Sequence, residues 1–281
     1  MVTIKNKNLS ADISLTGAEF QSIKVDGQER LWQGDEKFWK SKAPILFPIC
    51  GGLKDDKYIY NSKEYTLTKH GFLKYQKFEV VFQTENSVVL SFHSNDETKK
   101  SYPFDFEVKT KFTAENGEIT VEYEVANLSD RTMPFSIGGH EGYSLPNGIE
   151  NYNLVFEKEE DFDSSVITGN LLENYTNRVS ESGKVLPLKY EFFSIDALAF
   201  RSLKSRKVAI YSNDGEKKVE LDFEGFETLF VWTKPGAPYL CLEPWRGIPD
   251  LVGSSWDITE KTGIILLESG KTDTCTHKIK F

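Results

Sequence analysis

The sequence predicts an all-β protein built as a large antiparallel β-sandwich. Apolar residues alternate with single polar residues in several stretches, most clearly at Ile119, Val121, Tyr123 and Val125. This period of two is typical of strands with one buried and one wet face. Aromatic residues make up 13% of the chain, with 20 Phe and 12 Tyr, and such residues favour strands. No stretch of a dozen residues shows a helical period, so we expect little helix.

The composition limits the domain organisation and the partners. A chain of 281 residues can form one β domain, and we expect a single domain over residues 1–281. The net charge of −9 and the pI of about 5.2 argue against nucleic acid or an anionic membrane as partner. A small neutral ligand fits this balance, and either a monomer or a homodimer is compatible with it.

The sequence also favours a cytoplasmic location. Residues 1–7 contain no apolar signal core, and no apolar run approaches the length that spans a membrane. The number of cysteines is odd and they are widely spaced, which predicts reduced, structural thiols: Cys50, Cys241 and Cys275. No zinc-binding spacing or CxxC motif is present. We therefore predict neither a metal nor a cofactor.

Turn signals place the strands of the first half. Residues 2–33 read as strands, with a hairpin turn at Asp26-Gly27. The charged stretch 34–43 predicts a short helix or a loop. Another hairpin is expected around Asn61-Ser62, and a meander with a turn at Asn116-Gly117 follows it.

One segment of this half does not fit a strand. Residues 43–52 are too apolar for a surface loop, and their prolines and glycines exclude a regular inner strand. We expect a buried segment whose backbone passes close to a ligand or to another part of the chain.

The second half is less regular. Residues 149–190 are polar and only weakly strand-like, whereas a hairpin is expected across Asn213-Asp214-Gly215. The apolar run 239–242 predicts a buried strand that ends at Glu243, because Pro244 cannot donate a ladder hydrogen bond. Two further strands are expected within residues 263–279.

Glu243 is the first candidate for chemistry. A carboxylate at the end of a buried strand is costly unless it is paired or used. Burial would raise its pKa toward the range in which a Glu acts as a general base. The alternative is a strand-end Glu that reaches solvent, and Glu243 taken alone favours that alternative.

Two histidines lie at further breaks in the strand pattern. His70 precedes Gly71-Phe72, and His140 follows Gly138-Gly139, where glycine leaves room for a close turn or a ligand. Each of them, taken singly, is equally well explained as a hydrogen-bonded structural histidine. His93 and His277 lie in ordinary strand patterns, which predicts a structural role for both.

Several motifs, taken together and in order, resemble the aldose 1-epimerase (galactose mutarotase) superfamily, and within it the LacX-type mutarotase-related proteins. The ordered set spans almost the whole chain. It consists of Pro44-Ile45-Leu46-Phe47-Pro48-Ile49-Cys50-Gly51, His70-Gly71-Phe72, Gly138-Gly139-His140, Asp196-Ala197-Leu198-Ala199-Phe200, Leu242-Glu243-Pro244-Trp245, Gly263-Ile264 and Glu268-Ser269-Gly270.

The resemblance implies a galactose mutarotase-like supersandwich and a role for each matching residue. Glu243 would be the general base and His140 the general acid. His70 would bind and polarise the sugar, and Asp196 would hold hydroxyl groups. Such a carboxylate and imidazolium can interconvert α- and β-hexopyranoses through ring opening without a cofactor. Phe72, Tyr143 and Trp245 are candidates for stacking on the sugar, although core packing is the more common use and is favoured for most of them.

The sequence departs from the superfamily at three positions. Many members carry an Arg where Gly52 stands, and an Arg often follows the His-Gly-Phe motif where Lys74 is the nearby cation. A Pro commonly follows the histidine that corresponds to His140, and this chain has Glu141. Loss of a fork-shaped donor weakens bidentate recognition.

Three functions therefore stay open. The first is an aldose 1-epimerase acting on a free hexose such as galactose or glucose. The second is a hexose-6-phosphate 1-epimerase, with Lys54 or Lys74 in place of the missing Arg. The third is a non-catalytic carbohydrate-binding protein. We favour the free sugar, because we expect Asp55 and Asp56 near the mouth of the site.

The acid–base pair carries one more expectation. An imidazole with an ordinary pKa of about 6.5 is mostly neutral at neutral pH, so a nearby carboxylate should raise the pKa of His140. Adjacent residues of an extended strand point to opposite faces. We therefore assign this effect to Glu243 and expect Glu141 to have a smaller or purely structural role.

Overall fold

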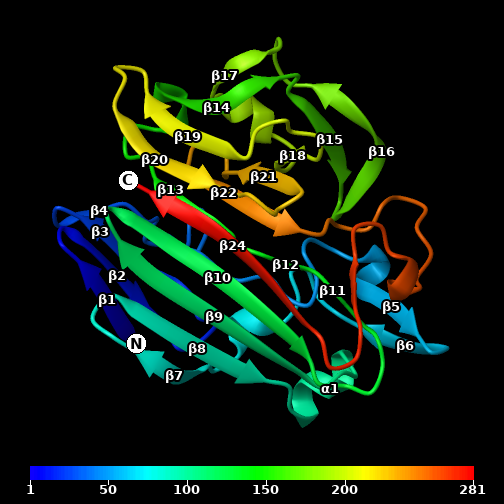
Figure 1. The fold of residues 1–281 in the computed structure, drawn as a ribbon. Helices are drawn as coiled ribbons and strands as arrows, with labels where there is room; N and C mark the ends of the chain where they lie inside the picture. The colour runs from blue at the N-terminus through cyan, green and yellow to red at the C-terminus, as the bar shows by residue number, and fades with distance from the viewer.

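Two large antiparallel sheets form the body of the protein. The computed structural model describes residues 1–281, and Figure 1 shows the strands of both sheets stacked in one continuous body. The nine-stranded sheet has the spatial order β17 (Gly183–Pro187), β14 (Tyr152–Glu160), β19 (Lys207–Ser212), β20 (Lys217–Asp222), β24 (Thr272–Lys280), β10 (Glu118–Asn127), β9 (Phe106–Glu115), β8 (Ser87–His93) and β7 (Glu79–Gln83). The predicted antiparallel β-sandwich is confirmed.

The second large sheet has seven strands. Six follow one path in the order β12 (Ile137–Gly138), β22 (Tyr239–Arg246), β21 (Thr228–Trp232), β18 (Leu198–Phe200), β15 (Asp163–Thr168) and β16 (Leu171–Arg178). The seventh, β13 (Glu141–Ser144), also pairs with β22. Strand β22, which lies between β21 and the edge formed by β12 and β13, is buried along most of its length.

Smaller elements complete the structure. A four-stranded sheet contains β1 (Val2–Asn6), β2 (Leu9–Ile13), β3 (Phe20–Val25) and β4 (Gln28–Glu29). Two-stranded sheets pair β5 (Lys57–Tyr60) with β6 (Lys63–Thr66) and β11 (Met133–Phe135) with β23 (Ile265–Leu267). The helical elements are α1 (Asp96–Ser101), η1 (Lys54–Asp56), η2 (Leu73–Tyr75), η3 (Ile149–Asn151), η4 (Tyr190–Phe193) and η5 (Ile258–Glu260).

The strand patterns fix which faces are buried. In β10, buried apolar residues alternate with half-buried polar residues from Glu118 to Val125, so one face packs into the core and the other stays wet. The last strand, β24, lies between β20 and β10 and joins the two halves of the nine-stranded sheet (Figure 1). One hydrophobic core of 61 residues extends from Ile4 to Ile279.

Most turn predictions are confirmed. Asp26-Gly27 connects β3 to β4, Asn61-Ser62 connects β5 to β6, and Asn116-Gly117 connects β9 to β10. All three turns contain residues with positive φ, as tight two-residue hairpin turns require. Residues 34–43 form turns and a short bridge rather than a helix.

One prediction about a strand is wrong. The strand β22 does not end at Glu243 but continues through Pro244 to Arg246. Pro244 is accommodated because the partner on one side changes there, from β13, which pairs with residues 239–242, to β12, which pairs with residues 245–246. Residues 149–190, which read as irregular and only weakly strand-like, contain the four strands β14 to β17.

The buried segment predicted at residues 43–52 is confirmed. Ala43 to Gly52 are all buried and form no regular strand. Leu46 exchanges two backbone hydrogen bonds with Gly138, and the carbonyl of Phe47 accepts from the backbone N–H groups of Phe72 and Leu73. The segment therefore ties together the chain regions that carry His140 and His70. None of the helices is long and apolar enough to cross a membrane.

Candidate active site

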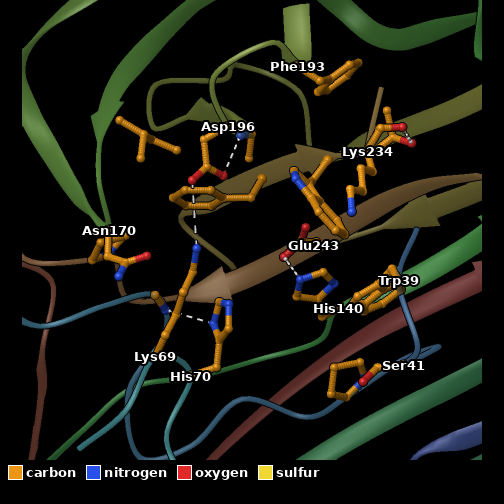
Figure 2. Close-up of a pocket in the computed structure, with 18 of the residues that line it drawn as sticks. Trp39, Ser41, Lys69, His70, His140, Asn170, Phe193, Asp196, Lys234 and Glu243 are labelled. Atoms are coloured by element: carbon orange, nitrogen blue, oxygen red, sulfur yellow. Dashed lines mark hydrogen bonds and ion pairs between the residues drawn. The ribbon is translucent and has the colours of Figure 1, made fainter. Parts of the chain in front are cut away.

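A cavity of about 730 Å³ lies over one face of the seven-stranded sheet. Its floor includes Phe230 and Trp232 of β21 with Glu243 and Trp245 of β22, and its walls are loops far apart in the sequence. Figure 2 shows His70, His140 and Glu243 directed into this cavity from three separate segments. The three candidates at breaks in the strand pattern are thus brought together.

Glu243 and His140 form a buried pair. The Oε2 atom of Glu243 lies 3.2 Å from Nε2 of His140, and the two side chains are 2% and 10% exposed (Figure 2). His140 is separated from β12 by one residue, Gly139, whose carbonyl accepts from the Trp245 indole N–H at 3.1 Å. The backbone that presents the imidazole is therefore held by the same strand that presents the carboxyl group.

Burial favours the neutral forms of both groups. It raises the pKa of the Glu243 carboxyl well above its ordinary value, and the positive charge of Lys69 opposes that shift. Burial also lowers the pKa of His140 to about 3. The expectation that Glu243 raises the pKa of His140 is wrong, because desolvation disfavours the charged forms of both groups.

His70 is held in one tautomer by its neighbour Gly51. The backbone N–H of Gly51 donates to Nδ1 of His70 at 3.1 Å, and the backbone N–H of His70 donates to the carbonyl of Gly51 at 2.8 Å. Because Nδ1 accepts, the proton of the neutral ring is on Nε2. Burial lowers the pKa of His70 well below its ordinary value, so the ring is a neutral hydrogen-bond donor.

The backbone at His70 leaves no room for a side chain at the next residue. A Cβ atom on Gly71, whose φ is +64°, would lie 2.2 Å from the carbonyl oxygen of Phe47. Only glycine allows this close approach. The His-Gly pair thus fixes His70 against the buried segment 43–52.

Asp196 and two lysines also line the cavity. The Asp196 carboxylate accepts from its neighbour, the backbone N–H of Ala197, at 2.8 Å and lies 3.9 Å from the Nζ atom of Lys69 (Figure 2). The Nζ atom of Lys74 donates to the carbonyl of Lys69 at 3.2 Å. Burial lowers the pKa of Lys74. Asp196 and Lys74 are therefore both placed where a ligand can meet them.

Aromatic rings form a second part of the wall. The ring of Trp39 stacks on His140, with centroids 4.9 Å apart and an interplanar angle of 27°, and Trp232 meets His140 edge-on. Trp245 lines the cavity as predicted and stacks on Phe230 at 3.9 Å. Trp39 was missed, because it lies in a charged stretch whose pattern gives no sign of a buried ring.

Two predicted stacking residues lie elsewhere. Phe72 packs against the core rings of Phe47, Tyr102 and Phe106 and does not line the cavity. Tyr143 is buried behind β22 with its ring near Phe281. For both residues the core-packing explanation is correct. Each lies shortly after a histidine that faces the cavity, but its own side chain faces the interior of the sandwich.

The acidic pair Asp55 and Asp56 does not line the cavity, so the expectation that these charges stand at its mouth is wrong. Lys54 lies over the ring of Trp256 instead of the cavity. The lysines that do line it are Lys69, Lys74 and Lys234. Of the lining acids, Glu19 already accepts from the backbone N–H groups of Lys42 and Ala43.

One residue group has the composition of a metal site. Potential ligand atoms of His140, Cys241 and Glu243 all lie within 4.8 Å of one another. Two of the three belong to the buried hydrogen-bonded pair described above, and the Cys241 side chain belongs to a small apolar cluster. The prediction of no metal therefore stays a prediction.

The sandwich with this cavity places the protein among the galactose mutarotase-like folds. A model of the family described as aldose 1-epimerase matches residues 1–274, and the chain belongs to that family. It is 36% identical over 262 residues to the plasmid-encoded protein LacX of Lactococcus lactis subsp. lactis, with 88% of each chain covered.

Solved structures agree with this assignment. A galactose mutarotase related enzyme from Lactobacillus acidophilus superposes with a TM-score of 0.93 and 30% identity, covering 99% of this chain and 96% of that chain. A galactose mutarotase-like protein from Lactobacillus casei gives a TM-score of 0.94 and 28% identity, covering 100% and 99%. Galactose 1-epimerase from Lactobacillus acidophilus, at 14% identity and a TM-score of 0.74 over 99% and 92%, shares the fold.

Proposed function

We propose that this protein is an aldose 1-epimerase that interconverts the α and β anomers of a hexose, with Glu243 and His140 as the proton-transferring pair. The observation that carries the proposal is the buried contact of 3.2 Å between these two side chains in a cavity large enough for a sugar. Ring opening requires one proton to leave the C1 hydroxyl while another reaches the ring oxygen, and a facing carboxylate and imidazolium supply both transfers.

The reaction conserves the proton of the pair. When a sugar enters, the proton of Glu243 moves to His140, and the carboxylate then takes the C1 hydroxyl proton. His140 gives its proton to the ring oxygen as the bond from C1 to that oxygen breaks. The aldehyde rotates about the C1–C2 bond, and the two groups reverse roles as the ring closes. No cofactor enters the balance.

The other lining groups fit recognition of the sugar. Neutral His70 directs an N–H donor, Asp196 offers carboxylate oxygens, and Trp39 and Trp245 offer ring faces that suit the C–H face of a pyranose. We take free galactose or glucose as the substrate. A hexose 6-phosphate is the second candidate, and a specific observation favours it: Lys69, Lys74 and Lys234 line the cavity while Asp55 and Asp56 do not.

Polarimetry with galactose, glucose and their 6-phosphates tests this proposal. Wild type should accelerate anomerisation, and Glu243→Gln should lower the rate by roughly 10²- to 10⁴-fold while keeping the fold, because the amide cannot take a proton. His140→Asn should remove most activity at every pH.

Near-normal rates in Glu243→Gln would remove this residue from the mechanism. A higher kcat/KM for a 6-phosphate would replace the free sugar by the phosphorylated one as substrate. Sugar binding without any acceleration would identify a non-catalytic carbohydrate-binding protein.

A further inference from the structure

The hairpin of β15 and β16 brings Asn170 to the cavity. This residue belongs to none of the sequence motifs and takes no part in the Glu243–His140 pair. The two-residue turn of the hairpin, Gly169-Asn170, lies between the paired residues Thr168 and Leu171. Next to the tip, the backbone N–H of Leu172 donates to the carbonyl of Asp250 at 2.9 Å. The tip is thereby fixed to the loop that follows β22.

Gly52 makes room for this tip. A Cβ atom on Gly52 would lie 2.6 Å from the Cβ atom of Asn170 and 2.9 Å from its carbonyl oxygen. Gly52 is not among the residues with positive φ, so its backbone conformation does not require glycine. The lack of space beside its Cα atom does require it. Any side chain at position 52 would have to occupy the volume that Asn170 fills.

The amide of Asn170 is free to meet a ligand. It takes part in no hydrogen bond within the protein, whereas the Asn174 amide further along β16 donates to the carbonyl of Val252. In Figure 2, Asn170 lies on the same side of His70 as Lys69, away from Trp39. An amide offers two N–H donors and a carbonyl acceptor, which is the combination that adjacent sugar hydroxyls require.

A turn residue needs no ligand to explain it, because Asn is common in two-residue hairpin turns. That explanation accounts for the residue type but not for its contact with Gly52. Asn61 shows the difference: it occupies the turn between β5 and β6, has positive φ and does not line the cavity. Asn170 is the second residue of its turn and has no positive φ, so the two asparagines share a two-residue hairpin turn but differ in their position in it and in what lies opposite them.

We infer that Asn170, which fills the space beside Gly52, is a sugar-binding residue that hydrogen-bonds ring hydroxyls and helps to determine which hexose is accepted. This inference rests on the proposed function. Because its side chain ends in a neutral amide, it selects hydroxyl groups by hydrogen bonding rather than by charge.

The test compares Asn170→Gly with the matched control Asn61→Gly. Glycine suits both turns, so both variants should fold, and only the first removes an amide from the cavity. We expect Asn170→Gly to raise KM, and the Kd measured by tryptophan fluorescence, by about tenfold for the preferred sugar, as loss of one or two hydrogen bonds predicts. The value of kcat should change much less. Asn61→Gly should match wild type.

Deoxy sugars identify the contact itself. For the deoxy sugar that lacks the contacted hydroxyl, wild type and Asn170→Gly should bind equally well, whereas the difference persists for the other deoxy sugars. Gly52→Ala should push the hairpin tip outward and raise KM, and it should add little to Asn170→Gly.

The outcomes distinguish a failure of the proposed epimerase function from a failure of the inference about Asn170. If wild type binds sugars but does not epimerise them, the proposed function fails while the fluorescence Kd values still decide the role of Asn170. Equal KM and Kd values for Asn170→Gly and Asn61→Gly with galactose, glucose and both 6-phosphates would overturn the inference. Failure of wild type to bind any of these sugars would overturn it as well.

Discussion

At the scale of single residues, the adjacent residues His140 and Glu141 point their side chains to opposite faces of the sheet. His140 faces the cavity, whereas Glu141 Oε1 lies 3.1 Å from Nε2 of His277 inside the sandwich, where both side chains are at most 3% exposed. Strand alternation predicts this division. The sequence thus indicates correctly that the Glu141 side chain points away from that of His140, although His277 as its partner was not predictable from a strand pattern.

Glu141→Gln tests this division. We expect a pH–rate profile like that of wild type from about pH 5 to about pH 9, because the Glu141 side chain contacts His277 inside the sandwich and does not line the cavity. Stability should fall by about 1–3 kcal/mol, because a buried hydrogen bond to His277 is weakened.

Polarimetry and urea unfolding of the same preparation measure both effects. A fall of activity in the alkaline range by a full pH unit would show that Glu141 acts on His140. His93→Gln serves as the control, since His93 is exposed and paired with Glu107 outside the cavity.

At the scale of elements, turn chemistry was the most reliable signal. Hairpins at Asp26-Gly27, Asn61-Ser62 and Asn116-Gly117 follow from residues that accept positive φ. Strand β16 escaped prediction because most of its residues are exposed on both faces, which leaves no alternation to detect. The continuation of β22 past Pro244 depends on a change of partner strand, and a single sequence contains no information about that change.

A buried ion pair holds the loop that supports His70. Lys261 Nζ lies 2.9 Å from Asp250 Oδ1 and also donates to the carbonyl of Ile248. The other oxygen of Asp250 accepts from the backbone N–H of Lys54. Pro249, between these anchors, packs against Gly51, whose N–H orients the imidazole of His70.

Asp250→Ala should therefore destabilise the protein by about 3–5 kcal/mol, because it leaves a buried lysine without its partner. The double variant Asp250→Ala/Lys261→Met should recover part of this loss. Urea unfolding measures both, with Glu64→Ala as the control: its exposed pair with Lys57 should contribute at most about 1 kcal/mol. Equal losses in the single and double variants would contradict the pairing as the cause.

At the scale of the whole molecule, the site exists only because the fold joins distant segments. His70, His140 and Glu243 could be predicted, since each interrupts a strand pattern and carries a motif. Trp39 and Asn170 could not, because their places in the wall depend on how loops meet across the sheet rather than on any local pattern. The same limit applies to Phe72, whose motif is intact although its ring packs into the core.

Burial of Glu243 and His140 in this site also makes the stability of the folded protein depend on pH. Burial raises the folded-state pKa of Glu243, so the folded protein binds this proton more tightly than the unfolded chain does. The stabilisation is complete below the ordinary pKa of about 4.3 and is lost as the pH rises toward the folded-state value. His140 acts in the opposite direction: its pKa is lowered to about 3, so its contribution is present above about pH 6.5 and is lost in acid.

Glu243→Gln removes the first of these two contributions and keeps the second. Its Tm should be close to that of wild type near about pH 4 and should exceed it by a growing margin as the pH rises, because each unit of pKa difference is worth about 1.4 kcal/mol. Thermal melts of both proteins across this range measure the margin. Glu115→Gln, a change at an exposed carboxylate, should show a margin near zero at every pH. A constant margin for Glu243→Gln would mean that burial does not raise the pKa of the Glu243 carboxyl in the folded protein, and that the carboxyl group is already ionised there at neutral pH.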